Sequence, residues 1–459
     1  MPDGTRPGVA PDPLTLPEAD RTAHSRSLRW RWQIFAVTWI AYAGFYFVRQ
    51  AFSVAKLGIL DDPAVNQTLT SHTLGVIDAV YLAAYAVGQF VWGSWADRVG
   101  PRVVVIGGMA GAVVASAVVG LSTSLLVFGA AMAVQGLAQS TGWAPLCKNV
   151  TSFVPVKERG RILGLWCTNY AFGGLAAPPF LGWWAYSVFD SWRVAFFAGS
   201  VTLAVVLVLF VVFQRNAPQD VGLPHPDADA DADEATAESE SESGAGAGSG
   251  STQPKAAPSS KEIYRAILRD RMVLTLSAAY FLLKPARYAL LLWGPVIVSQ
   301  RLPDAGKLEA TLIPVAFGVA GVLAPMTVGW ISDRLYSSRR VPPCVLSLGL
   351  LMVMLAAFVP LTATGSTATM VAVLAVIGFG LYAADALIAG VAAVDSGGSG
   401  GAGTATGFVN GCGSVGAILG GLLPGFLSTT PLFYGFAAAA ALAGLIMLPH
   451  WNRTSAAPH

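Results

Sequence analysis

The chain has 459 residues, of which 54% are hydrophobic and only 12% are charged, whereas soluble globular proteins carry about 25% charged residues. This composition, with a mean hydropathy of +0.58, excludes an ordinary soluble domain. The net charge of +2 gives no indication of nucleic-acid binding, and we expect no nucleic-acid partner. The four cysteines show neither disulfide nor metal-ligand spacing, so we expect small core residues and no metal or other cofactor.

The hydrophobic residues fall into blocks of about 20, long enough for a helix to cross a ~30 Å hydrocarbon core. These blocks are rich in Gly and Ala, which let helices pack closely in lipid. In chain order we predict twelve spanning helices, at 33–57, 72–93, 103–121, 124–147, 161–187, 192–213, 272–298, 308–331, 342–363, 368–391, 403–428 and 430–449. The fold class is therefore an all-α membrane protein, with counts of eleven or thirteen helices as alternatives.

The predicted helices form two six-helix halves joined by a long polar segment. In order, the parts are a tail (1–32), the N-terminal half (33–213), a linker (214–271), the C-terminal half (272–449) and a second tail (450–459). The linker contains an acidic run followed by Gly, Ala and Ser, a composition that predicts disorder. We favour a solvated linker over an acidic segment that binds a partner.

Lys and Arg in short loops predict the orientation, because such residues are retained on the cytoplasmic side. The segments 94–102, 148–161 and 332–341 carry the cations and lie on one side if twelve helices span. The basic end of the first tail lies on that side too. We therefore predict a multi-pass protein of the inner membrane with both termini cytoplasmic. The opposite loop 299–311 gives a weak counter-signal.

Three features recur between the halves at nearly constant spacing. The offsets are 333 − 97 = 236 for a Gly-x-x-x-Asp-Arg motif, 287 − 49 = 238 for Arg49 and Arg287, and 407 − 164 = 416 − 173 = 243 for two glycine pairs. Transporters built from repeats place the substrate near the bilayer midplane, between the repeats.

Arg49 and Arg287 lie well inside the first and seventh predicted helices. Charges inside the membrane are costly and indicate function. We expect the two arginines to face each other across one cavity, where their paired donors match a phosphate or carboxylate edge. The alternative is that each guanidinium only neutralises a buried acid.

Other charged or polar side chains in the predicted helices extend this site. Lys284 precedes Arg287 by three residues and shares its face, so it either adds a third positive charge or pairs with a carboxylate. Asp78 and Asp385 are the intramembrane acids and the candidates for proton coupling, and Asp385 could instead balance Lys284. Gln89 lies about three turns after Asp78, on the same face.

A short charged motif joins the second and third helices. It reads Asp97-Arg98-x-Gly-x-Arg102, and its copy in the other half begins with Asp333 and Arg334. These charges can bind a neighbouring helix end on the cytoplasmic side, so we predict a gate rather than a substrate site. The alternative is an ordinary loop that follows the positive-inside rule.

Six motifs together resemble those of the organophosphate:phosphate antiporter family of the major facilitator superfamily. They stand at Phe45–Phe52, Gly142–Lys148, Lys157–Gly160, Arg215–Pro224, Ala286–Pro295 and Gly401–Phe408. The resemblance covers nearly the whole chain outside the first tail and the linker. It implies the major facilitator fold and a secondary transporter, which exchanges an organic phosphate for inorganic phosphate by alternating access. We expect the transporter to be a monomer.

The resemblance also implies that Arg49 and Arg287 bind the phosphate. Gln89, Tyr170 and Leu292 depart from the Lys, His and acidic residue common in the family, so the organic part of the substrate is left open. Candidates to contact it are Tyr42, Tyr46, Trp166, Asn169, Tyr170 and Tyr288, each of which could instead be a packing residue. Two other functions stay open: a proton-coupled exporter that uses Asp78 or Asp385, and a membrane sensor. No catalytic set indicates an enzyme.

Overall fold

The computed structural model describes residues 18–224, 226, 269–337, 339–394 and 402–452, and this part of the chain is all-helical. The N-terminal half contains α1 (Glu18–Asp61), α2 (Ser71–Val99), α3 (Pro101–Leu121), α4 (Leu125–Gln139), α5 (Trp143–Ser152), α6 (Val156–Trp166), α7 (Thr168–Gly182), the π-helical η2 (Trp183–Val188) and α8 (Trp192–Phe213). The C-terminal half contains α11 (Arg271–Arg301), α12 (Lys307–Leu312), α13 (Val315–Leu335), α14 (Val341–Leu361), α15 (Thr367–Val394), α16 (Ala402–Phe426) and α17 (Thr429–Met447). Short 3-10 turns stand at Pro218–Val221, Thr362–Thr364 and Leu448–His450.

The twelve predicted helices correspond in order to these elements, and three of them are divided. The fourth comprises α4 and α5, the fifth comprises α6, α7 and η2, and the eighth comprises α12 and α13. Ten segments of the described residues are long and apolar enough to span a membrane. The first and fifth predicted helices are not among the ten. Residues 1–17 of the first tail, most of the linker and residues 453–459 of the second tail lie outside the described residues.

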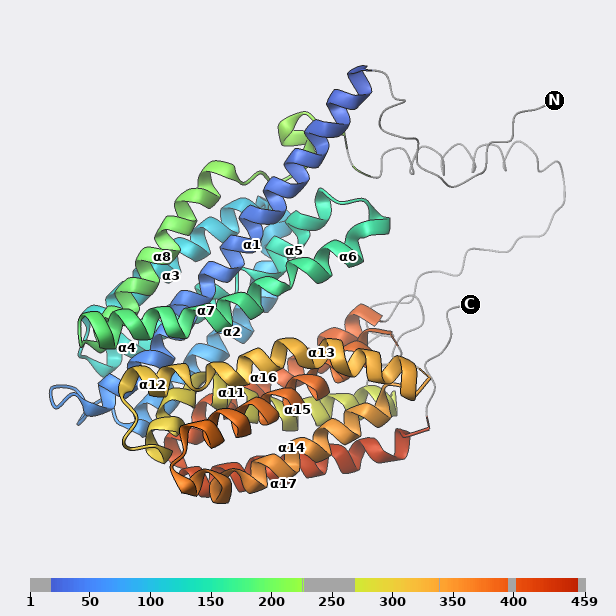
Figure 1. The fold of residues 1–459 in the computed structure, drawn as a ribbon. Helices are drawn as coiled ribbons and strands as arrows, with labels where there is room; N and C mark the ends of the chain where they lie inside the picture. The colour runs from blue at the N-terminus through green and yellow to red at the C-terminus, as the bar shows by residue number, and fades with distance from the viewer. Residues whose placement is uncertain (1–17, 225, 227–268, 338, 395–401, 453–459) are drawn as a thin grey trace.

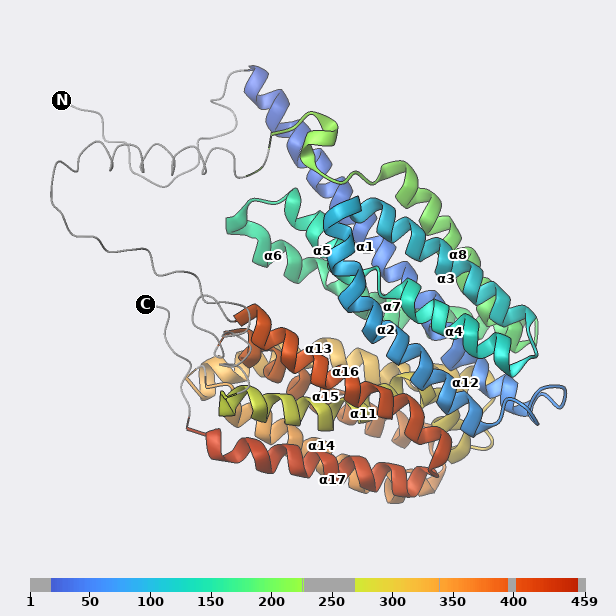
Figure 2. The same ribbon diagram turned by 180° about the vertical axis from the view of Figure 1, so that it is seen from behind.

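The helices form two bundles, one from each half of the chain (Figures 1 and 2). Within the bundles, α1 packs on α7 and α8, and α11 packs on α16 and α17. Between the bundles, α2 contacts α16, α1 contacts α11, and α7 contacts α12 and α13. The bundles lie close together near α4 and α12 and diverge toward the end that carries the start of α1 and the end of α17 (Figure 1).

The two halves that repeat in sequence also repeat a close contact between helices. A side-chain carbon on Gly173 of α7 would lie 2.9 Å from the carbonyl oxygen of Ala43 in α1. One on Gly416 of α16 would lie 2.3 Å from the carbonyl oxygen of Phe281 in α11. The two contacted residues are 281 − 43 = 238 positions apart, the offset that also separates the two arginines. Equivalent helices therefore approach each other at equivalent glycines in the two halves.

Candidate functional site

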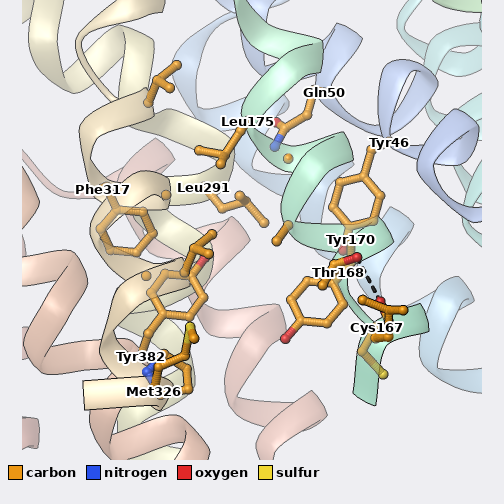
Figure 3. A pocket seen from close by; sticks show the side chains of 18 of the residues that line it. Tyr46, Gln50, Cys167, Thr168, Tyr170, Leu175, Leu291, Phe317, Met326 and Tyr382 are labelled. Atoms are coloured by element: carbon orange, nitrogen blue, oxygen red, sulfur yellow. Dashed lines mark hydrogen bonds between the residues drawn. The ribbon is translucent and has the colours of Figure 1, made fainter. Parts of the chain in front are cut away.

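A cavity of about 1030 Å³ lies between the bundles. Its wall is contributed by α1, α6 and α7 of one half and by α11, α12, α13 and α15 of the other. It extends from Arg31 and Glu158, which form an ion pair, to Tyr46 and Arg287. Tyr46 and Tyr170 stand on one wall, across from residues of α13 and α15 (Figure 3). Nowhere in the described residues do three His, Cys, Asp or Glu side chains gather where they could hold a metal ion.

Arg49 is held by neutral side chains rather than by an acid. Its Nε donates to Gln139 Oε1 at 3.0 Å, and the Tyr81 hydroxyl donates to the same oxygen at 2.8 Å. Its guanidinium carbon lies 4.6 Å from the ring centre of Tyr46 and 4.9 Å from that of Tyr85, which are cation–π distances. Its buried Nη2 has no hydrogen-bond partner among the described residues. The interpretation that Arg49 only neutralises an acid finds no support in this geometry.

Arg287 belongs to a three-residue ionic cluster. Its Nη1 donates to Asp385 Oδ2 at 2.9 Å, and Lys284 Nζ lies 3.1 Å from Asp385 Oδ1. Lys284 therefore pairs with a carboxylate, which the sequence had left open, and Asp385 contacts both cations. One carboxylate cannot neutralise two cations, so with Arg49 the three cations and one acid leave a net charge of +2. The buried Nε of Arg287 also lacks a partner in the described part of the chain.

The two arginines do not yet share the cavity in this conformation. Arg287 lines it, whereas Arg49 is absent from the lining residues. Tyr46 lines the cavity and contacts the Arg49 guanidinium. Arg49 is therefore one aromatic side chain away from the space that Arg287 reaches, and the expectation that both face one cavity is met only for Arg287.

Asp78 has a different partner from any that the sequence suggested. It is fully buried, and its Oδ2 lies 2.5 Å from Nζ of Lys56, which is also fully buried. Lys56 donates as well to the carbonyl oxygen of Leu292 at 2.9 Å and lies 4.3 Å from the ring of Trp293. This pair therefore connects α1 and α2 of one half to α11 of the other. Gln89, predicted on the same face as Asp78, is half-buried and is not a lining residue of the cavity.

The remaining candidates divide between the cavity wall and the packed interior. Tyr46 and Tyr170 line the cavity, whereas Tyr42, Trp166, Asn169 and Tyr288 do not. Trp166 is fully buried, donates to Thr38 Oγ1 at 3.0 Å and packs on Tyr42, so these two are packing residues here. Asn169 is fully buried, and neither of its amide atoms has a hydrogen-bond partner among the residues described.

Several residues of the site were not predicted from the sequence. Gln139 and Tyr81 position Arg49, and Tyr85 covers its guanidinium. Tyr382 lies 4.7 Å from the guanidinium of Arg287. A signal for Tyr382 existed, because it precedes Asp385 by three residues and so shares its helix face. For Gln139 the signal was weaker: it is a polar residue in an otherwise apolar helix.

The predicted gating residues lie at the end where the bundles diverge. Arg102, at the start of α3, donates from Nη2 to the Val211 carbonyl at 2.6 Å and from its backbone N–H to Asn216 Oδ1 at 2.9 Å. A cation thus binds the C-terminal end of α8, where the helix dipole favours it. Arg98 and Asp333 are exposed, and the Arg334 guanidinium lies 5.2 Å from the ring of Trp330. The side chain of Asp97 lies outside the description.

The sequence matches the family model described as Major Facilitator Superfamily over residues 34–421. It is 30% identical to the membrane sensor protein UhpC of Salmonella typhimurium, over 92% of each chain. It is 26% identical to the glucose-6-phosphate exchanger SLC37A2 of Mus musculus, over 93% of each. Among solved structures, a D-xylose–proton symporter superposes with a TM-score of 0.69 at 15% identity, over 91% of this chain and 97% of that one.

Proposed function

Since the chain belongs to the Major Facilitator Superfamily and, within it, to the organophosphate:phosphate antiporter family, we propose that it exchanges an organic phosphate for inorganic phosphate across the membrane. One observation carries this proposal. A site with a net charge of +2 lies between the two halves, and each half contributes one arginine with a buried N–H that has no hydrogen-bond partner within the described ranges. Buried donors rarely lack hydrogen-bond partners in native proteins. The oxygens of a bound phosphate would be the acceptors for these two N–H groups.

The same charges account for exchange by alternating access. Two guanidiniums brought together in a low-dielectric cavity repel each other, and a phosphate that bridges them removes this cost. Substrate would first reach Arg287, which lines the cavity, and then Arg49 as Tyr46 moves and the halves approach. Binding energy thereby favours the closed state. An empty, positively charged site closes reluctantly, so the return step is faster with phosphate bound.

The proposal includes an orientation. The basic loops and the mouth of the cavity lie at the same end of the molecule, where Arg31 and Arg161 line the wall. By the positive-inside rule this end is cytoplasmic. The cavity then opens to the cytoplasm, with both termini on that side of the cell membrane, and a single chain forms the complete pathway.

Purified protein in phosphate-loaded proteoliposomes tests the exchange. We expect uptake of radiolabelled phosphate that depends on phosphate inside the vesicles and is inhibited by organic phosphates outside. Uptake that follows an imposed pH gradient and ignores internal phosphate would instead identify a proton-coupled transporter that uses Asp385 or Asp78.

A second function is favoured by one specific observation. The 30% identical relative is named a membrane sensor, so the same site could bind a phosphorylated ligand without moving it. Binding of phosphate to the purified protein, with no exchange in proteoliposomes, would support the sensor and contradict the antiporter.

A further inference from the structure

The wall of the cavity is largely apolar beyond its charged residues. Besides several prolines and glycines, its apolar side chains include Leu175, Leu290, Leu291, Phe317, Val322 and Met326. Phe317 and Met326 stand near Tyr382, and Leu175 and Leu291 extend the surface toward Gln50 (Figure 3). These side chains come from α7 and from α11 and α13, so both halves contribute apolar surface.

The serine and threonine hydroxyl groups of the wall already donate to the protein itself. Ser53 Oγ donates to the carbonyl oxygen of Leu291 at 3.2 Å. Thr168 Oγ1 donates to the carbonyl oxygen of Leu165 at 2.7 Å, and Thr311 Oγ1 donates to that of Lys307 at 2.9 Å. At the mouth, the charges of Arg31 and Glu158 pair with each other. Apart from the Cys167 thiol, a weak donor, and the indole N–H of Trp32, the uncharged polar side chains that remain in this wall are Gln50 and three tyrosines.

A polyhydroxylated substrate fits such a wall poorly. Each sugar hydroxyl that leaves water needs a hydrogen-bond partner, and burial without one is costly. Surface that suits an apolar group is abundant in this wall. Aromatic faces and edges are offered by the rings of Tyr46, Tyr170, Phe317 and Tyr382. A thioether such as that of Met326 adapts to irregular apolar groups.

We propose that the organic part of the substrate is apolar, as in an aryl or alkyl monophosphate or phosphonate, rather than a sugar. This inference rests on the proposed function, because it assumes that the phosphate end is bound by the arginines. The phosphate group then supplies the affinity shared with inorganic phosphate, and the apolar wall selects the group attached to it.

Competition against phosphate exchange tests the inference. Phenyl phosphate and glucose 6-phosphate present the same phosphate monoester on bodies of similar ring size, so their comparison isolates the wall. We expect phenyl phosphate to halve the exchange of radiolabelled phosphate at a concentration roughly tenfold or more below that of glucose 6-phosphate, since apolar pockets discriminate by about this factor. Equal or better competition by glucose 6-phosphate overturns the inference and leaves the antiporter standing, whereas absent phosphate exchange overturns both.

Variants of the wall give a second measurement, the ratio of the two inhibitory concentrations. Leu175→Gln introduces a hydrogen-bonding amide, and Leu175→Met is the matched apolar control. Met326→Gln makes the same change on the opposite half and serves if the first variant fails to fold. We expect either Gln variant to shift the ratio severalfold toward glucose 6-phosphate and Leu175→Met to leave it unchanged. An unchanged ratio in both Gln variants contradicts an apolar recognition surface.

Discussion

At the scale of single residues, the two arginines are equivalent in sequence but not in environment. Arg49 is oriented by an amide and covered by aromatic rings, whereas Arg287 shares Asp385 with Lys284. Arg49 therefore holds a positive charge that no described carboxylate balances. A ligand anion would therefore meet an uncompensated positive charge on the N-terminal half and a cluster whose positive charge is partly neutralised by Asp385 on the C-terminal half.

Lys is the informative replacement for either arginine. Arg49→Lys and Arg287→Lys keep the charge but remove the planar fork that binds two phosphate oxygens. A hydrogen bond to a charged group contributes about 1.5–3 kcal/mol, so we expect phosphate affinity to fall roughly 10- to 150-fold in each. Calorimetric titration measures this, with thermal unfolding as the control for folding. Affinity close to that of the unmodified protein in both variants would rule out the phosphate clamp.

The Asp385 carboxylate should compete with the substrate phosphate for Arg287 and Lys284. Replacing it by Asn frees Arg287 and Lys284, so we expect Asp385→Asn to bind phosphate about tenfold more tightly. The same change should slow exchange, because the carboxylate no longer helps to displace the bound anion. Asp385→Glu keeps the charge and serves as the control. Weaker phosphate binding in Asp385→Asn would show instead that the carboxylate only positions Arg287.

The sequence identified the charged members of the site because each is a charge in an apolar helix. It could not identify their partners, since pairing depends on which helix faces which. Lys56 shows the limit: it stands one residue before the predicted end of the first helix, where a lysine can reach the interface. In the structure α1 continues to Asp61 and Lys56 is fully buried.

At the scale of elements, the Lys56–Asp78 pair holds α1, α2 and α11 together where the halves meet. Removing one partner leaves an unpaired buried charge, which costs about 3–5 kcal/mol. We expect Lys56→Met to lower the thermal unfolding temperature of the purified protein clearly and Lys56→Met/Asp78→Asn to recover part of the loss. A double variant less stable than Lys56→Met would contradict this account of the pair.

The repeated glycines differ in what they do, and the difference is testable. Gly416 lies where a side-chain carbon would meet the Phe281 backbone, whereas Gly407, nine residues earlier in α16, has nothing within 4 Å of that position. Gly416→Ala should therefore destabilise the protein by about 1–3 kcal/mol through overpacking. Gly407→Ala is the matched control and should be neutral or slightly stabilising, because Ala is the better helix former. Equal effects of the two substitutions would argue against close packing of α16 on α11.

The sequence predicted where the helices lie but not where they break. Hydropathy gives the length of each apolar segment, and the segments match α1 to α17 in order. The divisions between α4 and α5 and between α6 and α7 fall at short polar stretches, at Gln139–Thr141 and Thr168–Asn169. A hydropathy average over about 19 residues is too coarse to resolve them. The same holds for Gly164 and Gly173: the repeat marks both, yet only Gly173 lies at a close helix contact.

At the scale of the whole molecule, the repeat predicted two similar halves with a site between them. It could not predict their relative arrangement, because one sequence must support both an open and a closed state on each side. The cavity reaches Arg287 but not Arg49 in this structure, a property of one conformation rather than of the fold. Alternating access requires that the end now closed, near α12, also opens.

The contact between Asp61 and Lys307 offers a direct test of that opening. Asp61 ends α1 and Lys307 begins α12, and their side chains lie 3.1 Å apart across the two halves. In a background without the four cysteines, joining Asp61→Cys to Lys307→Cys with a short bifunctional thiol reagent should hold this end closed. We expect exchange to stop after cross-linking and the uncross-linked variant to remain active, because an exposed ion pair contributes only about 0–1 kcal/mol.

A control pair lies at the same end but within one half. Thr367 donates to Glu309 at 3.0 Å, and both belong to the C-terminal half. Joining Glu309→Cys to Thr367→Cys should leave exchange nearly intact, because rigid halves move relative to each other while their internal contacts persist. Loss of exchange in both cross-linked pairs would indicate that helices move within the C-terminal half. Exchange that survives the cross-link between the halves would show that this end need not open, which is incompatible with alternating access through the cavity.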